Sequence, residues 1–271
     1  MRPTMRRRSL LVGTLAAAPL LVRAQASKPV ALPLRFGADV ALADAGLAGA
    51  LQHAFGRDTG LAVQLIRTPA LPLLEALGEG ELDVALTNVP GAETRLESEG
   101  LAYDRRAVAT GRFVLVGPTA RHGDSGGPAR GHDVAAALKW WREAGTDARA
   151  QPFLSANDGS GVHLAEQAAW RLAGLAPAPP WYRVAAAGTA LVTDARKQGA
   201  YALVEAGVWA REGGAPLSVL VDGDERLDER VHVMRSFRSM HPAAKLFVGW
   251  ITGARGRSVV AAQRGYRVPA G

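Results

Sequence analysis

From residue 34 onwards, short apolar segments alternate with segments of helical periodicity, and no other feature of the sequence restricts the fold as strongly. Residues 34–37 predict a strand, and residues 47–55 carry apolar side chains at the spacing of an amphipathic helix. Residues 61–66 and 83–87 predict further strands on either side of a second helix at 71–77. This order of elements is typical of a mostly parallel sheet with helices on both faces.

The second half of the chain repeats this scheme, with a stretch rich in glycine and proline at residues 123–131. The predicted strands of this half are 113–117, 153–154 and 201–204, and the predicted helices are 134–141, 164–172 and 190–197. Residues 217–221 and 231–234 predict two more strands, and residues 242–263 predict terminal helices that begin at a proline. We expect these last elements to return to the first half.

Two packed lobes are the simplest organisation for this pattern. Residues 27–271 are enough for one large domain or two of ordinary size, and they contain no repeat of solenoid period. We expect residues 30–112 and 213–271 to form lobe 1 and residues 113–212 to form lobe 2. The predicted fold class is α/β, with each lobe a mostly parallel sheet flanked by helices.

Residues 1–26 have the pattern of a secretory signal. Residues 1–8 hold four arginines and no acidic residue, residues 9–22 are mostly apolar, and Ala24-Gln25-Ala26 offers an A-x-A cleavage site. The sequence Arg-Arg-Ser-Leu-Leu at residues 7–11 is similar to the core of a twin-arginine signal. The predicted location is therefore the periplasm. A permanent membrane anchor is the alternative, which the short apolar run disfavours.

Charge and composition narrow the function. Without the five arginines of residues 1–26, the formal net charge falls from +7 to +2, and no run of basic residues remains that could follow phosphates. Nucleic acid is therefore not an expected partner. The absence of cysteine excludes disulfides, thiolate metal sites and cysteine nucleophiles. The six histidines show no H-x-x-x-H spacing, and we expect neither a metal nor a cofactor.

Polar loops follow several of the predicted strands, at residues 37–46, 68–70, 155–163 and 185–189. Ligands of open α/β sheets bind beyond the carboxyl ends of strands, where helix N-termini offer free N–H groups. The candidate ligand-binding residues in these loops are Asp39, Val40, Thr68, Ser155, Asn157, Ser160, Gly161, Val162, Gly188 and Thr189. Turns and helix capping are the alternative role, because Ser, Asp and Thr are favoured at helix starts in any protein.

Several motifs of the chain resemble those of the periplasmic tungstate-binding family. Residues 34–48 align without gaps on the family's L-R-L-A-T-T-T-S-T-R-D-S-G-L-L and match it at Leu34, Arg35, Asp44, Gly46 and Leu47. Further similar segments are Gly80, Asp83 and Val84 (G-x-x-D-V), Tyr103–Arg106 (a Y-x-D-R-R turn), 113–118 (F-V-I-V-G-P), 155–163 (S-R-x-D-x-S-G-T-H), 181–182 (W-Y) and 199–209 (G-A-Y-T-L-x-D-x-x-T-W).

The resemblance implies a type II periplasmic binding protein, the substrate-binding component of an ABC transporter. It also implies a small solute or ion as ligand, the membrane subunit of the transporter as partner, no catalysis and, we expect, a monomer. The sequence differs from the family at the positions where the family binds its oxyanion. Residues 38–41 (Ala-Asp-Val-Ala) replace T-T-T-S, Ala156 replaces an arginine, and Val162 replaces a threonine.

These replacements bear on the ligand. A tetrahedral dianion needs several donors and usually a cation to replace its hydration, and Asp39 instead adds a like charge. We therefore expect a solute other than an oxyanion, neutral or carrying an amine. Two other readings remain open. A solute sensor would dock on a signalling membrane protein, and a serine hydrolase would use Ser160, His163 and Asp158, although the G-x-S-x-G elbow is absent.

Overall fold

The computed structural model describes residues 32–119, 127–128, 130–144 and 152–270. The predicted signal at 1–26 and most of the glycine- and proline-rich stretch lie outside the described residues. No helix within the described ranges has the length and apolar character to cross a membrane. Residues 32–271 form one compact unit.

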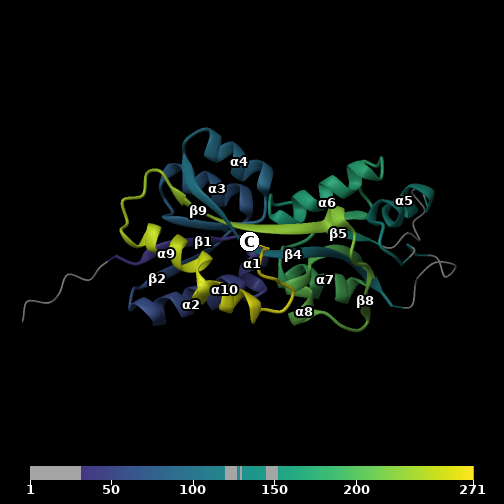
Figure 1. Cartoon of the computed structure of the whole chain (residues 1–271). Coiled ribbons are helices and arrows are strands. Elements are labelled where there is room, and N and C mark those ends of the chain that lie inside the picture. Colours follow the sequence, from purple (N-terminus) through teal and green to yellow (C-terminus); the bar gives the residue numbers. More distant parts are fainter. Residues whose placement is uncertain (1–31, 120–126, 129, 145–151, 271) are drawn as a thin grey trace, which may run out of the picture. The chain divides into compact units, whose positions relative to one another are not determined.

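Five strands form a first sheet, sheet A, in the order β2-β1-β3-β9-β4 (Figure 1). The strands are β1 (Leu34–Ala38), β2 (Val63–Arg67), β3 (Val84–Thr87), β4 (Ala102–Pro118) and β9 (Asp228–Ser236). β1 is parallel to both β2 and β3, whereas β9 is antiparallel to β3 and to β4. The parallel part thus lies at one side of the sheet and the antiparallel part at the other.

A second sheet, sheet B, continues from the far end of β4. Its strands follow the order β4-β7-β5-β6, and β8 pairs with β4 beside them. The strands are β5 (Phe153–Ser155), β6 (Tyr182–Val184), β7 (Tyr201–Glu205) and β8 (Leu217–Val221). β5 is parallel to β6 and β7, whereas β7 and β8 run antiparallel to β4. The two sheets are therefore built on the same plan.

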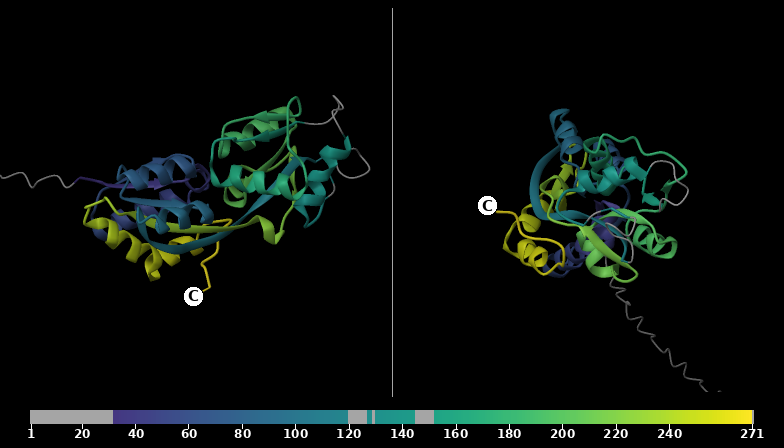
Figure 2. Two further views of the ribbon diagram at one scale, coloured as in Figure 1. Left: turned by 90° about the horizontal axis from the view of Figure 1, so that it is seen from above. Right: turned by 90° about the vertical axis from the view of Figure 1, so that its right-hand side faces the viewer.

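β4 belongs to both sheets. Its residues 102–112 pair with β9, and its residues 113–118 pair with β7 and β8. The two views of Figure 2 show β4 and β9 running side by side between the helical layers. The polar residues Tyr103–Arg106 predict a turn, but they lie within β4 as an irregularity at which Asp104 has φ +57°. A bulge absorbs the extra residues without ending the strand.

Helices cover both faces of each sheet. Those beside sheet A are α1 (Val40–Asp44), α2 (Leu47–Thr59), α3 (Ala70–Glu79), α4 (Pro90–Ser98), α9 (Ala243–Thr252) and α10 (Ala254–Ala261). Those beside sheet B are α5 (Val134–Ala144), α6 (Gly161–Leu172), α7 (Thr189–Gln198) and α8 (Ala206–Glu212). Successive side chains of a strand point to opposite faces of sheet A, and this alternation decides which helices each side chain contacts. Phe36 packs with α2 and α9, whereas Ala85 and Met234 belong to the cluster of α3.

The α/β class and the positions of the main elements agree with the sequence pattern. Strand β8 is an exception in its placement: residues 217–221 are expected in lobe 1, but they pair with Leu115–Pro118 in sheet B. The pattern also misses α1, α4, α8 and β6, which are short or weakly periodic. The exact limits of the two lobes stay a prediction.

The aromatic cluster under α9 offers a test of this packing. Phe247 is fully buried, with its ring centroid 4.7 Å from that of Phe36 and 4.9 Å from that of Phe55. Phe247→Ala is therefore predicted to lower the free energy of unfolding by about 3–5 kcal/mol, because it leaves a cavity. Its half-exposed neighbour Leu246 is the matched control, and Leu246→Ala should change stability by less than about 1 kcal/mol. Urea denaturation measures both, and equal losses would contradict the inward face assigned to α9.

Candidate ligand-binding site

Asp39 links the two sheets through its buried carboxylate. It follows β1 directly, has no exposed surface, and caps α1 through a hydrogen bond that its Oδ1 accepts from the Ala41 N–H at 3.0 Å. Its Oδ2 accepts a hydrogen bond at 3.2 Å from the N–H of Gly161, the first residue of α6. The loop after β1 in sheet A therefore meets the loop after β5 in sheet B at this carboxylate.

The loop that leads into α6 is held by its own polar groups. The Ser160 side chain is fully buried and its Oγ caps α6 by accepting from the His163 N–H at 3.4 Å, while Asp158 Oδ1 accepts from the Ser160 N–H at 2.9 Å. The Gly159 N–H donates to Nδ1 of His163 at 3.0 Å. The capping role considered for Ser160 is thus the one its geometry shows. The loop also contacts α3, which packs beside sheet A, because the Leu71 N–H donates to the Gly159 carbonyl.

The surroundings of Asp39 pull its pKa in two directions. Burial favours the neutral acid and is the larger effect, whereas the N–H groups of Ala41, Gly161 and Ala70 favour the carboxylate. The net result raises the pKa of Asp39 to about 6. Ala70 and Gly161 are the first residues of α3 and α6, so the positive ends of two helices face this acid.

A second acid, Asp44, makes a similar link at the end of α1. Its Oδ2 accepts from the Thr189 N–H at 2.9 Å and from the Thr189 hydroxyl at 3.3 Å, at the start of α7 in sheet B. Arg67 donates to both oxygens of Asp44, at 2.7 and 2.8 Å. Burial raises the pKa of Asp44, but these hydrogen bonds outweigh it and the pKa lies below its ordinary value. Gly188, at φ +67°, passes so close to Asp44 that a side chain would collide with the carboxylate.

Two glutamic acids lie buried nearby, Glu205 at the end of β7 and Glu229 on β9. The Tyr266 hydroxyl donates to Oε1 of Glu205, and the Asn88 amide donates to Oε1 of Glu229 at 2.5 Å. Burial raises the pKa of Glu205 to about 8, with a further rise from the charges of Asp39 and Asp44. Burial and the charge of Glu205 hold the pKa of Glu229 well above its ordinary value. Two more buried acids therefore lie near the junction of the two sheets.

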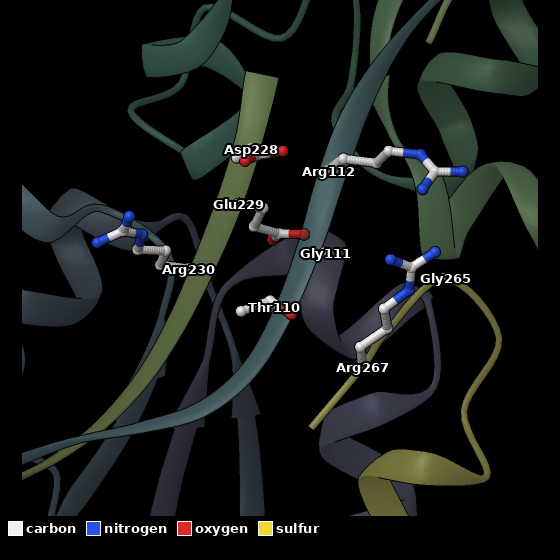
Figure 3. A pocket seen from close by; sticks show the side chains of 8 residues that line it. All are labelled: Thr110, Gly111, Arg112, Asp228, Glu229, Arg230, Gly265 and Arg267. Atoms are coloured by element: carbon white, nitrogen blue, oxygen red, sulfur yellow. The ribbon is translucent and has the colours of Figure 1, made fainter. Parts of the chain in front are cut away.

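The open space around these acids is divided. A cavity of about 280 Å³ lies where β4 and β9 run side by side, and Figure 3 shows the Glu229 side chain pointing across it towards Gly111. Its lining residues are Thr110, Gly111, Arg112, Asp228, Glu229, Arg230, Gly265 and Arg267. A cavity of only about 10 Å³ lies among Ala41, Val162, Gly188 and Glu205, close to the room that one water needs. The loops beside Asp39 are thus nearly closed on each other.

The predicted ligand-binding residues separate into two groups. Asp39, Val40, Gly161, Val162, Gly188 and Thr189 lie where the loops of the two sheets meet. Thr68, Ser155, Asn157 and Ser160 have other places. Thr68 bonds through its N–H to the Ala38 carbonyl, Ser155 Oγ accepts from the Asn157 N–H, and Asn157 is exposed. A ligand-binding role for any of these ten residues stays a prediction.

Four residues at the junction were not predicted: Asp44 as a link between the sheets, Asn88, Glu205 and Glu229. Glu205 ends the apolar run Tyr201–Val204, and an acidic residue directly after a buried strand is the signal that could have identified it. Glu229 and Asn88 carry no comparable signal, because they approach each other only through the pairing of β9 beside β3. Within the described ranges, no group of three or more metal-ligating side chains is arranged to hold a metal ion.

The raised pKa of Glu205 predicts how stability depends on pH. The native protein keeps this proton up to about pH 8, whereas an unfolded glutamic acid loses it near pH 4.3. Because the native state binds more protons in that window, its stability falls as the pH rises. Glu205→Gln should remove this loss and stabilise the protein more at pH 8 than at pH 5, with a difference above about 1.4 kcal/mol, the equivalent of one pKa unit.

Urea denaturation of the wild type and the Glu205→Gln variant at the two pH values measures this difference. Glu225→Gln is the control, because Glu225 is exposed and its replacement should have the same small effect at both pH values. An equal effect of Glu205→Gln at pH 5 and pH 8 would contradict a buried, protonated Glu205.

The chain is similar to proteins named for anion binding and tungstate binding. No family model matches the chain. It is 30% identical over 182 residues to a Haloferax volcanii protein named as an ABC transporter anion-binding protein, a match that covers 66% of this chain and 51%, about half, of that relative. It is 26% identical over 229 residues to the tungstate-binding protein TupA of Peptoclostridium acidaminophilum, covering 80% of this chain and 76% of that protein.

Solved structures agree with these relatives. The tungstate ABC transporter structure from Geobacter sulfurreducens superposes with a TM-score of 0.71 at 26% identity, covering 84% of this chain and 97% of that one. The chain therefore has the type II periplasmic binding protein fold and is a homologue of ABC-transporter anion-binding and tungstate-binding proteins.

Proposed function

We propose that the chain is the periplasmic solute-binding component of an ABC-type importer, similar to tungstate-binding proteins but with a ligand other than an oxyanion. The observation that carries this proposal is the bond from the Gly161 N–H to Asp39 Oδ2, because it joins a loop of sheet A to a loop of sheet B. Two loops that meet at one point can enclose a solute between them. The names of the homologues support the transport role.

The connection between the sheets supports capture by closure. β4 and β9 pass from one sheet towards the other, so the two halves can rotate about this ribbon as hinged lobes. A solute that contacts both loops binds the closed form more tightly and shifts the population towards it. The membrane subunit of the transporter would then recognise the closed form.

The charges at the junction support a neutral or amine-bearing ligand. Asp39, Glu205 and Glu229 are buried there, and none forms an ion pair with a described cation. A like charge about 4 Å from Asp39 costs about 4 kcal/mol at an effective dielectric near 20. An ammonium group would instead find oxygen acceptors, since Asn88 Oδ1, Glu205 Oε2 and Glu229 Oε2 are buried without a hydrogen-bond partner.

The location follows from residues 1–26, which support export to the periplasm, with residues 7–11 favouring the twin-arginine route. A monomer is proposed. Catalysis is not part of the proposal, because Ser160 Oγ is buried as a helix cap and bonds to the backbone of His163 rather than to its ring. The homologues are likewise named as binding proteins.

A solute screen tests the proposal. The chain without residues 1–26 is heated with oxyanions, amines, amino acids and small sugars, and its melting temperature is recorded. A true ligand at one hundred times its Kd stabilises by about 2.7 kcal/mol, which corresponds to several degrees. We expect stabilisation by members of the amine, amino-acid or sugar groups. Strong stabilisation by tungstate or molybdate alone would contradict the ligand class, and no stabilisation by any solute would contradict capture itself.

A second measurement separates delivery to a transporter from sensing. If genes beside the coding sequence encode a permease and an ATPase, the purified pair in proteoliposomes should hydrolyse ATP faster when the liganded protein is added. No stimulation, together with binding to a signalling membrane protein, would favour the sensor reading.

A further inference from the structure

Asp39 has a buried carboxylate that is hydrogen-bonded by backbone N–H groups. Both carboxylate oxygens accept such bonds, Oδ1 from Ala41 at 3.0 Å and Oδ2 from Gly161 at 3.2 Å. Ala70 contributes a third N–H that favours the charged form. Since Gly161 and Ala70 begin helices of 12 and 10 residues, the carboxylate lies where two helix N-termini from different sheets converge.

Two other buried acids, Asp83 and Glu93, are paired with cations. Asp83 lies beside Arg35, with Arg35 Nη2 2.8 Å from Asp83 Oδ1, and Glu93 lies beside Arg105 and His232. Among the ion pairs formed by described residues, none includes Asp39. A fully buried carboxylate that forms no direct ion pair and is held by converging N–H groups has the surroundings of a bound anion.

The space around this carboxylate is filled from a second side. Asn88 is buried, and its amide reaches the start of α6 so closely that a Cβ on Gly161 would lie 1.9 Å from Asn88 Oδ1. This Oδ1 has no hydrogen-bond partner. The cavity left beside Ala41 and Val162 measures about 10 Å³. This small cavity cannot hold a tetrahedral oxyanion beside the carboxylate, and the larger cavity of about 290 Å³ next to Asn88 and Gly161 does not include Asp39 in its lining.

We propose that the Asp39 carboxylate is a tethered anion, which occupies the anion-binding position between the two loops and thereby excludes free oxyanions from it. The proposal rests on the proposed function, since it takes the junction of the loops as the solute site. The proposal predicts what happens when the carboxylate is removed. The N–H groups of Gly161, Ala41 and Ala70 are then unpaired, and a small free anion can take the place of the carboxylate.

Formate, which is a carboxylate without the rest of the side chain, is the probe. Thermal unfolding of the full chain at pH 7.5 is followed with increasing sodium formate, with sodium chloride at equal ionic strength as reference. For Asp39→Ala we expect a saturable rise in melting temperature that reaches about 4 °C at ten times the Kd. The wild type and Asp39→Asn should show no such rise, because their side chains still fill the position.

Asp158→Ala is the matched control. It removes an acid from the loop that leads into α6, and Asp158 Oδ1 accepts from the Ser160 N–H rather than from Gly161, so formate should not stabilise this variant. Asp39→Ser extends the test to larger anions, with tungstate expected to stabilise it and not the wild type. If Asp39→Ala does not fold alone, its yield of folded protein on refolding should rise with formate and not with chloride.

The outcomes separate the two proposals. Equal responses to formate in Asp39→Ala and Asp158→Ala, or tight tungstate binding by the wild type, would overturn the tethered anion. A formate response in Asp39→Ala alone would support it even if the solute screen finds no ligand, in which case only the transport function fails. A ligand found in the screen without any formate response would leave the transport function and remove this inference.

Discussion

The arrangement of this protein at its centre depends on satisfying one buried carboxylate. A charged group removed from water must recover its hydrogen bonds from the protein, and Asp39 recovers them from the N–H groups at helix starts. One of these donors, Gly161, belongs to sheet B, so satisfying the carboxylate also fixes the loop of one sheet against the other. Asp44 makes the same kind of link, because it accepts a hydrogen bond from the Thr189 N–H at the start of α7. The loops of the two sheets are therefore joined by polar contacts with fixed geometry.

Buried acids that pair with an arginine and buried acids at the junction of the two sheets have pKa values shifted in opposite directions. Asp83 is held by Arg35 and by the Ser239 hydroxyl, and its pKa lies below its ordinary value although burial alone would raise it. Asp39 and Glu205 have no such cation, and burial raises their pKa values. Scaffold pairs of this kind fix the sheet, whereas the unpaired acids retain the capacity to meet a donor from outside.

Local sequence signals explain which parts of the fold could be predicted. Local sequence predicted the helix that ends before Gly60 and the strand Leu217–Val221. A glycine at a helix end and a short apolar run can each be recognised from a few consecutive residues. The full length of β4 was not predicted, because the polar residues Tyr103–Arg106 resemble a turn and only pairing with β9 keeps them in the strand. Asp39 and Gly161 could be proposed from their loops. Glu229 and Asn88 could not, because 141 positions separate two residues that only the sheet brings together.

The passage of β4 through both sheets has a mechanical consequence. Residues 102–112 are tied to β9 by backbone hydrogen bonds, and residues 113–118 are tied to β7 and β8, so neither half can slide along the strand without breaking a ladder. Bending or twisting near Gly111 and Arg112 is the movement that preserves both ladders. If the two halves open by such a movement, the continuous strand keeps them in one alignment, so the loops that carry Asp39 and Gly161 would meet in the same register when they close.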